Sequence, residues 1–366
     1  MALISELKNK YKVVSVVGMA KNAGKTTTLN YLIEEAMDEG IKLGITSTGR
    51  DGEGIDVATG TEKPKVYLYP ETLVSVPAGL FEYATANMEI LCMTKYHTSL
   101  GAAMICRVVD GGDVQIAGPV LTSDQLNIAK DMLALGAEMI LIDGAIDRKS
   151  IASPEASDAI ILATGAVLSR NMQKVVAETA YLASLYSLQQ IGDVSVRELF
   201  QKAEKITFIG RTDCQNVLCS DDQHEGSADN QNERRSANPN VIYEEVRELD
   251  IKTGIAASNI IDEAINDETK YIYIPGALTS SVIENIHPKK FKHVTFVVKD
   301  PTKIFISSTE WQKLRKKEFK LEVINEIKIA AISVNPMSPE GHAFEREEFM
   351  TAMRSAIPNV QIIRVR

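Results

Sequence analysis

The sequence lacks several features that would assign it to a specialised class of protein. It has only four cysteines in 366 residues, too few for a disulfide framework in a chain of this length. No run approaches the roughly 18 uncharged apolar residues that a membrane-spanning helix needs, and residues 1–12 contain no apolar core of a signal peptide. We therefore expect a cytoplasmic protein with reduced thiols and no membrane partner.

A surplus of positive charge is also missing. The chain has 40 Lys and Arg against 49 Asp and Glu, which gives a formal net charge of -9. This balance argues against broad attraction to nucleic-acid phosphates, so we expect no nucleic-acid partner and a local site for any small anion. Cys214 and Cys219 are spaced C-x4-C, but the second pair that a zinc site would need is absent.

Apolar runs rich in Val and Ile alternate with segments of helical period along most of the chain. This is the pattern of parallel strands joined by crossover helices. It predicts an α/β fold with a doubly wound, mostly parallel sheet and a second, smaller α/β region. The expected strands are 13–17, 42–46, 138–142, 159–163, 205–209, 271–274, 293–298 and 328–334. The expected helices are 25–38, 123–135, 169–187, 257–266 and 308–317.

The composition changes at residues 220–240, "SDDQHEGSADNQNERRSANPN", where charged and amide residues replace nearly every large apolar one. Such a segment cannot bury enough surface to offset the entropy lost on ordering. We predict a first domain at 1–212, a polar mobile linker or loop at 213–240, and a second α/β domain at 241–366 for partner or effector recognition. The alternative is that this polar segment is a surface loop within a single domain built on one continuous sheet.

The stretch "VVSVVGMAKNAGKTTTLNYLIEEAMDEG", residues 13–40, predicts a strand, a loop of small residues and a helix. A loop at a helix N-terminus presents unpaired N–H groups and the positive end of the helix dipole, which suits a phosphate. The hydroxyl of Thr26 can coordinate Mg2+ beside the phosphates, and Thr27 and Thr28 could contact the α-phosphate. The residues expected to bind the nucleotide are Gly18, Lys21, Asn22, Ala23, Gly24, Lys25, Thr26 and Thr27.

Magnesium beside a phosphate loop needs acidic partners at the ends of neighbouring strands. In "EMILIDGAID" four apolar residues end at Asp143, whose carboxylate would hold the metal directly or through a water. The alternative is that Asp143 only caps the following turn. A second acidic stretch, "GITSTGRDGEGID", follows the expected strand 42–46, and Arg50 within it could reach the γ-phosphate. Its glycines equally suit a flexible surface loop.

The phosphate loop resembles that of a known class. Five residues separate Gly18 from Gly24, where the common G-x4-G-K-[ST] pattern has four. This spacing is similar to that of dethiobiotin synthetase, and hence to the SIMIBI NTPases. The resemblance implies that Asp51, with Glu53 in reserve, is delivered toward the metal and substrate. With the residues above, this gives Lys25, Asp51 and Asp143 as catalytic residues and Thr26, Asp51 and Asp143 as metal ligands.

Lys21 departs from one branch of that class. It stands four residues before Lys25, where the signature lysine of the MinD-type dimerising ATPases stands five before. The trans-acting role of the signature lysine is therefore not carried over to Lys21.

Three stretches have a narrower resemblance. "VSVVGMAKNAGKTTTLNYLI", "TSTGRDGE" and "VNPMSPEGHAF" resemble the P-loop subunits of lysine 5,6-aminomutase reactivases. This resemblance implies ATP-dependent exchange of damaged cobalamin from an adenosylcobalamin enzyme, together with a MutS-related partner ATPase. The sequence lacks the Asp-x-His-x-x-Gly pattern of cobalamin-ligating domains.

The choice of base stays open. The Asn-Lys-x-Asp guanine motif is missing, since "VVKDPTK" at 297–303 has no asparagine in the required place. Asn335, directly after the expected strand 328–334, could contact an adenine edge or a substrate amide, or could simply form a turn with Pro336. These residues do not decide between the bases, so ATP is only slightly preferred and GTP remains an alternative.

Three functions fit these residues. The first is an Mg2+-dependent NTPase that acts as a switch on a protein partner or client enzyme. The second is a dethiobiotin synthetase-like enzyme that phosphorylates a small carboxyl-type substrate, and the third is a nucleotide-binding assembly subunit without turnover. The extra α/β region favours the first, and a homodimer is compatible with each.

Overall fold

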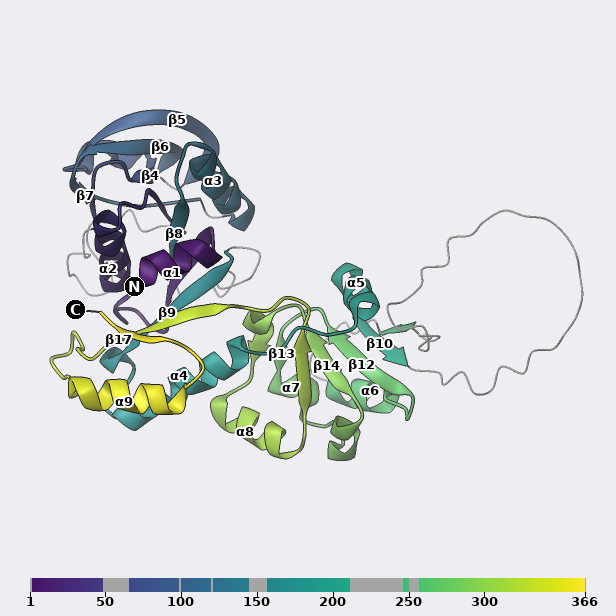
Figure 1. The fold of residues 1–366 in the computed structure, drawn as a ribbon. Coiled ribbons are helices and arrows are strands. Elements are labelled where there is room, and N and C mark those ends of the chain that lie inside the picture. Colours follow the sequence, from purple (N-terminus) through teal and green to yellow (C-terminus); the bar gives the residue numbers. More distant parts are fainter. Residues whose placement is uncertain are drawn as a thin grey trace, which may run out of the picture. The chain divides into compact units, whose positions relative to one another are not determined.

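The computed structural model describes residues 2–48, 66–98, 100–119, 121–144, 157–210, 246–249 and 257–365. The chain forms two compact units (Figure 1). The first comprises Met1–Ser187 and Ile327–Arg366, and the second comprises Leu188–Glu326.

A nine-stranded sheet forms the centre of the first unit, in the order β18-β17-β9-β1-β8-β2-β4-β6-β5. The strands from β18 to β4 run parallel, and β6 is antiparallel to both β4 and β5. Their bounds are β1 Val13–Gly18, β2 Leu43–Ser47, β4 Leu73–Pro77, β5 Asn87–Thr98, β6 Gly101–Asp110, β8 Met139–Gly144, β9 Ala159–Gly165, β17 Ile329–Asn335 and β18 Ile362–Arg364. A separate antiparallel pair joins β3 Val66–Leu68 to β7 Gly112–Val114.

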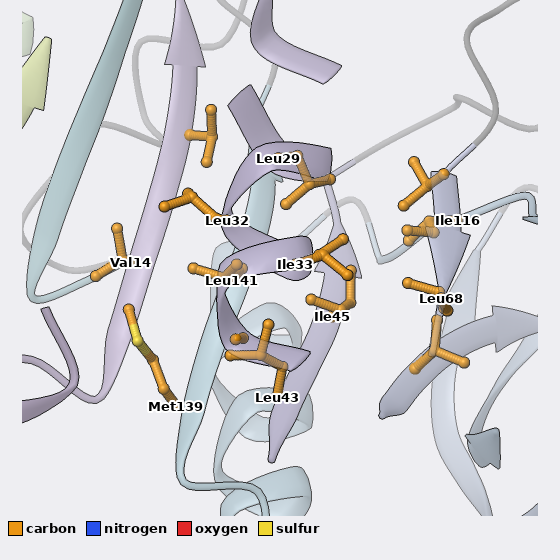
Figure 2. Close-up of a cluster of buried hydrophobic side chains, with 14 of the residues drawn as sticks. Val14, Leu29, Leu32, Ile33, Leu43, Ile45, Leu68, Ile116, Met139 and Leu141 are labelled. Atoms are coloured by element: carbon orange, nitrogen blue, oxygen red, sulfur yellow. The ribbon is translucent and has the colours of Figure 1, made fainter. Parts of the chain in front are cut away.

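Helices pack on both faces of this sheet. They are α1 Leu3–Lys10, α2 Lys25–Asp38, α3 Thr122–Ala134, α4 Met172–Tyr186 and α9 Arg346–Ala356, with short 3-10 turns η1 Ala78–Tyr83 and η3 Ala166–Leu168. Val14 packs with Leu29 of α2, whereas the neighbouring Val13 packs with Ile128 of α3. Successive strand residues point to opposite faces, so these two helices cover opposite sides. Figure 2 shows the α2 side, where leucine and isoleucine side chains of the helix lie against those of β2 and β8.

The second unit has a five-stranded sheet in the order β11-β10-β12-β14-β16. The last three of these strands are parallel to one another, and β10 is antiparallel to both of its neighbours. Its elements are α5 Val194–Lys202, β10 Ile206–Gly210, β11 Val246–Leu249, α6 Ala257–Ala264, β12 Thr269–Ile274, β13 Leu278–Thr279, α7 Ser280–Ile283, η6 Pro288–Lys292, β14 Thr295–Val298, η7 Pro301–Lys303, β15 Ile304–Phe305, α8 Ser308–Lys316 and β16 Lys320–Val323. Buried aromatic rings form part of its core, such as those of Phe291 and Phe319, whose ring centroids are 5.1 Å apart.

The α/β class expected from the sequence is confirmed, and every expected strand and helix coincides with an observed element within a few residues. The antiparallel β5–β6 pair was not expected. None of the helices in the described parts of the chain combines the length and the apolar character needed to cross a membrane.

The division into units differs from the predicted domains 1–212 and 241–366. Residues 188–210 belong to the second unit, and residues 327–365 return to the first, where β17 pairs with β9. The prediction was wrong because the β9–β17 pairing joins segments more than 160 residues apart, which a change of composition along the chain cannot reveal. The predicted linker at 213–240 lies outside the described residues.

Candidate functional site

The carboxyl ends of five parallel strands meet at one edge of the first sheet. β1 lies between β8 and β9, β2 follows β8, and β17 follows β9. Ligands of open α/β sheets bind outside the carboxyl ends of the strands. The loop after β1 therefore lies where such a site is expected.

The loop from Gly18 to Gly24 turns sharply into α2. Asn22 and Gly24 both have positive φ, 62° and 96°, a conformation that asparagine and glycine adopt at least cost. The helix begins at Lys25, and Gly24 provides no side-chain cap for its first N–H groups. These donors point out of the helix end at the positive end of its dipole, as an anion site requires.

The sequence-predicted loop residues differ in their surroundings. Lys21, Asn22 and Thr27 are exposed, and Lys25 and Thr26 are half-buried. Ala23 is buried, and its N–H donates to the carbonyl of Ala20 at 3.3 Å. In this conformation the loop itself therefore uses the Ala23 donor that was expected to bind nucleotide.

The ammonium group of Lys25 lies 3.1 Å from Oδ1 of Asp143. Their side chains are only 20% and 14% exposed, so this ion pair is shielded from most of the solvent. Asp143 lies in β8, and Lys25 is the first residue of α2, which follows the loop after the adjacent parallel strand β1, where Val16 is the register partner of Asp143. The structure therefore brings together the cation and the carboxylate that the sequence singled out separately.

The backbone of Asp143 is held by the end of β2. Its carbonyl accepts hydrogen bonds from the N–H of Thr48 at 3.1 Å and from the hydroxyl of Ser47 at 3.2 Å. These bonds fix the position of the residue while leaving its carboxylate directed at Lys25. The sequence reasoning had not identified Ser47 or Thr48, although their place at the end of an expected strand could have suggested them.

Thr28 does not serve the role expected of it. Its hydroxyl is fully buried, donates to the carbonyl of Gly24 at 2.9 Å and lies 2.7 Å from the hydroxyl of Ser333 in β17. The expected contact with an α-phosphate is therefore wrong for this conformation, and Thr28 instead ties the helix start to β17. Thr27, at the preceding position, is exposed.

Asn335, at the end of β17, lies against the loop. A Cβ atom placed on Gly24 would be 2.9 Å from Cβ of Asn335, so only glycine fits there. The side-chain oxygen of Asn335 accepts from the N–H of Met337 at 3.1 Å, which is the turn-forming role considered from the sequence. The loop after β17 is joined to the end of β9 by His342, whose Nε2 lies 2.8 Å from the carbonyl of Ala166.

Several predicted residues lie outside the described part of the chain. Asp51, expected to act in catalysis and to bind the metal, is one of them, and so are Arg50 and Glu53. Within the described residues, no group of three or more His, Cys, Asp or Glu is arranged to hold a metal ion. Thr26 and Asp143 carry oxygen atoms of the kind that Mg2+ prefers, and beside nucleotides this ion is commonly held mainly by phosphate oxygens and water.

Comparison of the chain with protein-family models, with curated proteins and with solved structures finds no match.

Proposed function

We propose that this chain is an Mg2+-dependent nucleoside triphosphatase, with ATP as the preferred nucleotide, that uses hydrolysis as a switch on a partner protein. The observation that carries the proposal is the shielded pair of Lys25, at the start of α2, with Asp143, near the carboxyl end of β8. It lies beside a helix start whose N–H groups have no side-chain cap. Cation, carboxylate and free amide donors are the groups that an Mg2+–polyphosphate needs.

Each residue would have a distinct task. Lys25 would pair with the outer phosphates, while the amide donors of the first turn of α2 bind their oxygens. Thr26 and Asp143 would hold Mg2+, which supplies charge neutralisation as the terminal phosphoryl group leaves. Asp51 keeps its predicted part in this set.

The path of the chain supports a switch in preference to simple turnover. The second unit is inserted between α4 and β17 of the first. β17 ends at Asn335 against Gly24, and its Ser333 contacts Thr28 at the start of α2. A change in the loop on nucleotide binding would therefore act directly on a strand that leads to the second unit.

The test combines thermal shift and phosphate release with Mg-ATP and Mg-GTP. A ligand that binds only the folded state raises the melting temperature by mass action, so the parent protein should gain stability with ATP. Lys25→Ala should lose both the shift and the hydrolysis. The control is Lys42→Ala, because this lysine is more than half exposed and pairs with Glu71 at 3.4 Å away from the candidate residues.

Two results would remove the proposal. One is a parent protein that shows no nucleotide-dependent shift with either nucleotide at millimolar concentration. The other is a Lys25→Ala variant that binds and hydrolyses like the parent. Hydrolysis that requires a small carboxylic acid and yields its phosphorylated product would favour the dethiobiotin synthetase-like alternative.

The client protein is proposed from the sequence resemblance. An inactivated adenosylcobalamin-dependent aminomutase is incubated with this chain, its candidate partner ATPase, ATP and fresh coenzyme. Recovery of aminomutase activity with the parent chain, and none with Lys25→Ala, is the expected result. Recovery that is equally large without ATP would show that this chain acts on the aminomutase without using the nucleotide.

A further inference from the structure

The outer strand of the first sheet, β5, has an apolar open edge. It is the last strand in the sheet order, and within the described residues its only strand partner is β6 (Figure 1). Its 12 residues make it longer than the five or six typical of strands. Ile90 is 46% exposed and Met93 is 60% exposed. A long edge strand with exposed apolar side chains is a template for pairing with another strand.

Ile90 and Met93 share one face of the sheet. Ile90 is the register partner of Cys106, and Met93 is the partner of Met104. Cys106 and Met104 both belong to the core on the α2 side. Because directly paired residues point to the same face, Ile90 and Met93 also lie on the α2 side.

Leu91 and Cys92 both lie on the other face, because a β-bulge follows Ile90 and interrupts the alternation of the strand. Cys92 is the partner of Ile105, which belongs to the core on the α3 side, and Leu91 packs against that same core. The register shift between Ile90 and Cys92 accommodates the extra residue. Two consecutive residues therefore point the same way, where a regular strand would alternate.

This bulge makes the strand self-complementary. Leu91 and Cys92, on either side of the central point of this stretch, both face the α3 side. The residues that flank them, Ile90 and Met93, both face the α2 side. A second copy running antiparallel about this point would place Ile90 opposite Met93, and Leu91 opposite Cys92, with matching faces in each pair. We propose that β5 pairs with β5 of a second copy of this chain and joins the two sheets across a two-fold axis at this point.

The charges of the strand agree with this pairing. Glu89 and Lys95 are the charged residues between Met88 and Thr98. In the proposed register, Glu89 lies opposite Thr94 of the second copy and one position from its Lys95. The two Glu89 side chains, by contrast, are five positions apart. Thr94 and Lys95 point to opposite faces, so Glu89 and Lys95 do not meet, but no two like charges oppose each other, and this absence of repulsion agrees with a second copy at this edge.

The first test measures the oligomeric state by sedimentation over a concentration series. The parent protein should form a dimer. Ile90→Lys and Met93→Lys should each weaken dimerisation by about tenfold or more, because each variant places two desolvated ammonium groups in the β5–β5 interface. The control is Ile260→Lys, since Ile260 is 40% exposed on α6 of the second unit. Thermal melts show whether each variant is folded. A parent protein that is monomeric at 200 μM, or a dimer that both β5 variants leave intact, would overturn the proposal.

The second test uses Cys92 directly. In a Cys214→Ser/Cys219→Ser background, a short bis-maleimide should link Cys92 of the two copies into a covalent dimer, because these cysteines lie next to each other across the axis. Cys106 is buried and should not compete. Adding Cys92→Ser should abolish the product. No covalent dimer under conditions where Cys92 reacts with a single maleimide would contradict the register.

This inference is independent of the nucleotide site. Lys25→Ala should dimerise like the parent protein, so failure of the nucleotide proposal and failure of the β5 proposal are separate outcomes.

Discussion

Replacing Asp143 with asparagine removes one charge of the Lys25 pair with little change in shape. At a separation of 3.1 Å and an effective dielectric constant of about 20, the attraction between the two charges is about 5 kcal/mol before desolvation. Both side chains are mostly removed from water, and that desolvation cancels a large part of the attraction. We expect a coupling free energy of about 1–3 kcal/mol in a double-mutant cycle of Lys25→Met and Asp143→Asn without nucleotide.

The same substitution should change nucleotide binding in opposite ways with and without magnesium. In the parent protein, a phosphate must compete with Asp143 for the ammonium of Lys25. Asp143→Asn removes that competition, so Mg-free ATP should bind more tightly, by about tenfold for each 1.4 kcal/mol released. The gain in affinity that Mg2+ gives the parent protein should be lost, because the variant lacks the carboxylate that would hold the ion.

Calorimetric titration with ATP in EDTA and with Mg-ATP measures both effects. The exposed pair Lys42–Glu71, 3.4 Å apart and more than half exposed on each side, is a matched control whose coupling should not exceed about 1 kcal/mol. If Asp143→Asn binds both forms of ATP as the parent does, Asp143 has no part in the site. A Lys25–Asp143 coupling no larger than the control would show that the shielding has no energetic effect.

Three further predictions concern stability. Thr28→Val should cost about 1–2 kcal/mol in urea unfolding because it leaves Ser333 without its buried partner, and adding Ser333→Ala should recover part of this loss. Gly165→Ala should cost about 2 kcal/mol or more in the same assay, since its new Cβ would lie 2.3 Å from the backbone oxygen of Asn335. Burial raises the pKa of Glu322 despite nearby lysines, so unfolding releases its proton and stability falls as pH rises from the ordinary glutamate pKa through the raised one. Glu322→Gln should flatten that fall in melting temperature and be the more stable protein at neutral pH.

Local signals in the sequence were sufficient for the centre of the site. The apolar run before Gly18 and the periodic helix after Gly24 predicted β1 and α2, and the observed helix has the predicted bounds 25–38. Asp143 was found because four apolar residues precede it and a strand must end nearby. These features depend on residues close in sequence, where propensity and periodicity act.

The contacts that complete the site depend on distant parts of the chain. Thr28 was assigned to a phosphate because it follows Gly24-Lys25, but its partner Ser333 is 305 residues away. Asn335 was recognised as the end of a strand, yet its position against Gly24 follows from the place of β17 beside β9. A polar residue within an expected buried strand, such as Ser333, was the available signal.

β5 was missed for a different reason. Its sequence does not alternate with period two, because register shifts interrupt its pairing with β6 at three places. Periodicity therefore gave no strand signal over 87–98, and the neighbouring β6 was lost with it. The irregularity that concealed the strand is also the feature that makes its edge complementary to itself.

The second unit is inserted into the first, and this connection is the physical basis of the proposed switch. A domain attached by one flexible linker transmits little, because the linker absorbs any displacement. Here the chain leaves the first unit after α4, which follows the end of β9, and returns through β17. The last residue of β17, Asn335, is packed so closely against Gly24 that the loop cannot change shape there without moving the strand end. β17 is hydrogen-bonded to both β9 and β18, and the chain passes from the second unit into the first at Ile327, two residues before this strand begins. In the proposed switch, the second unit is therefore the part of the chain that we expect to respond to the state of the phosphate loop.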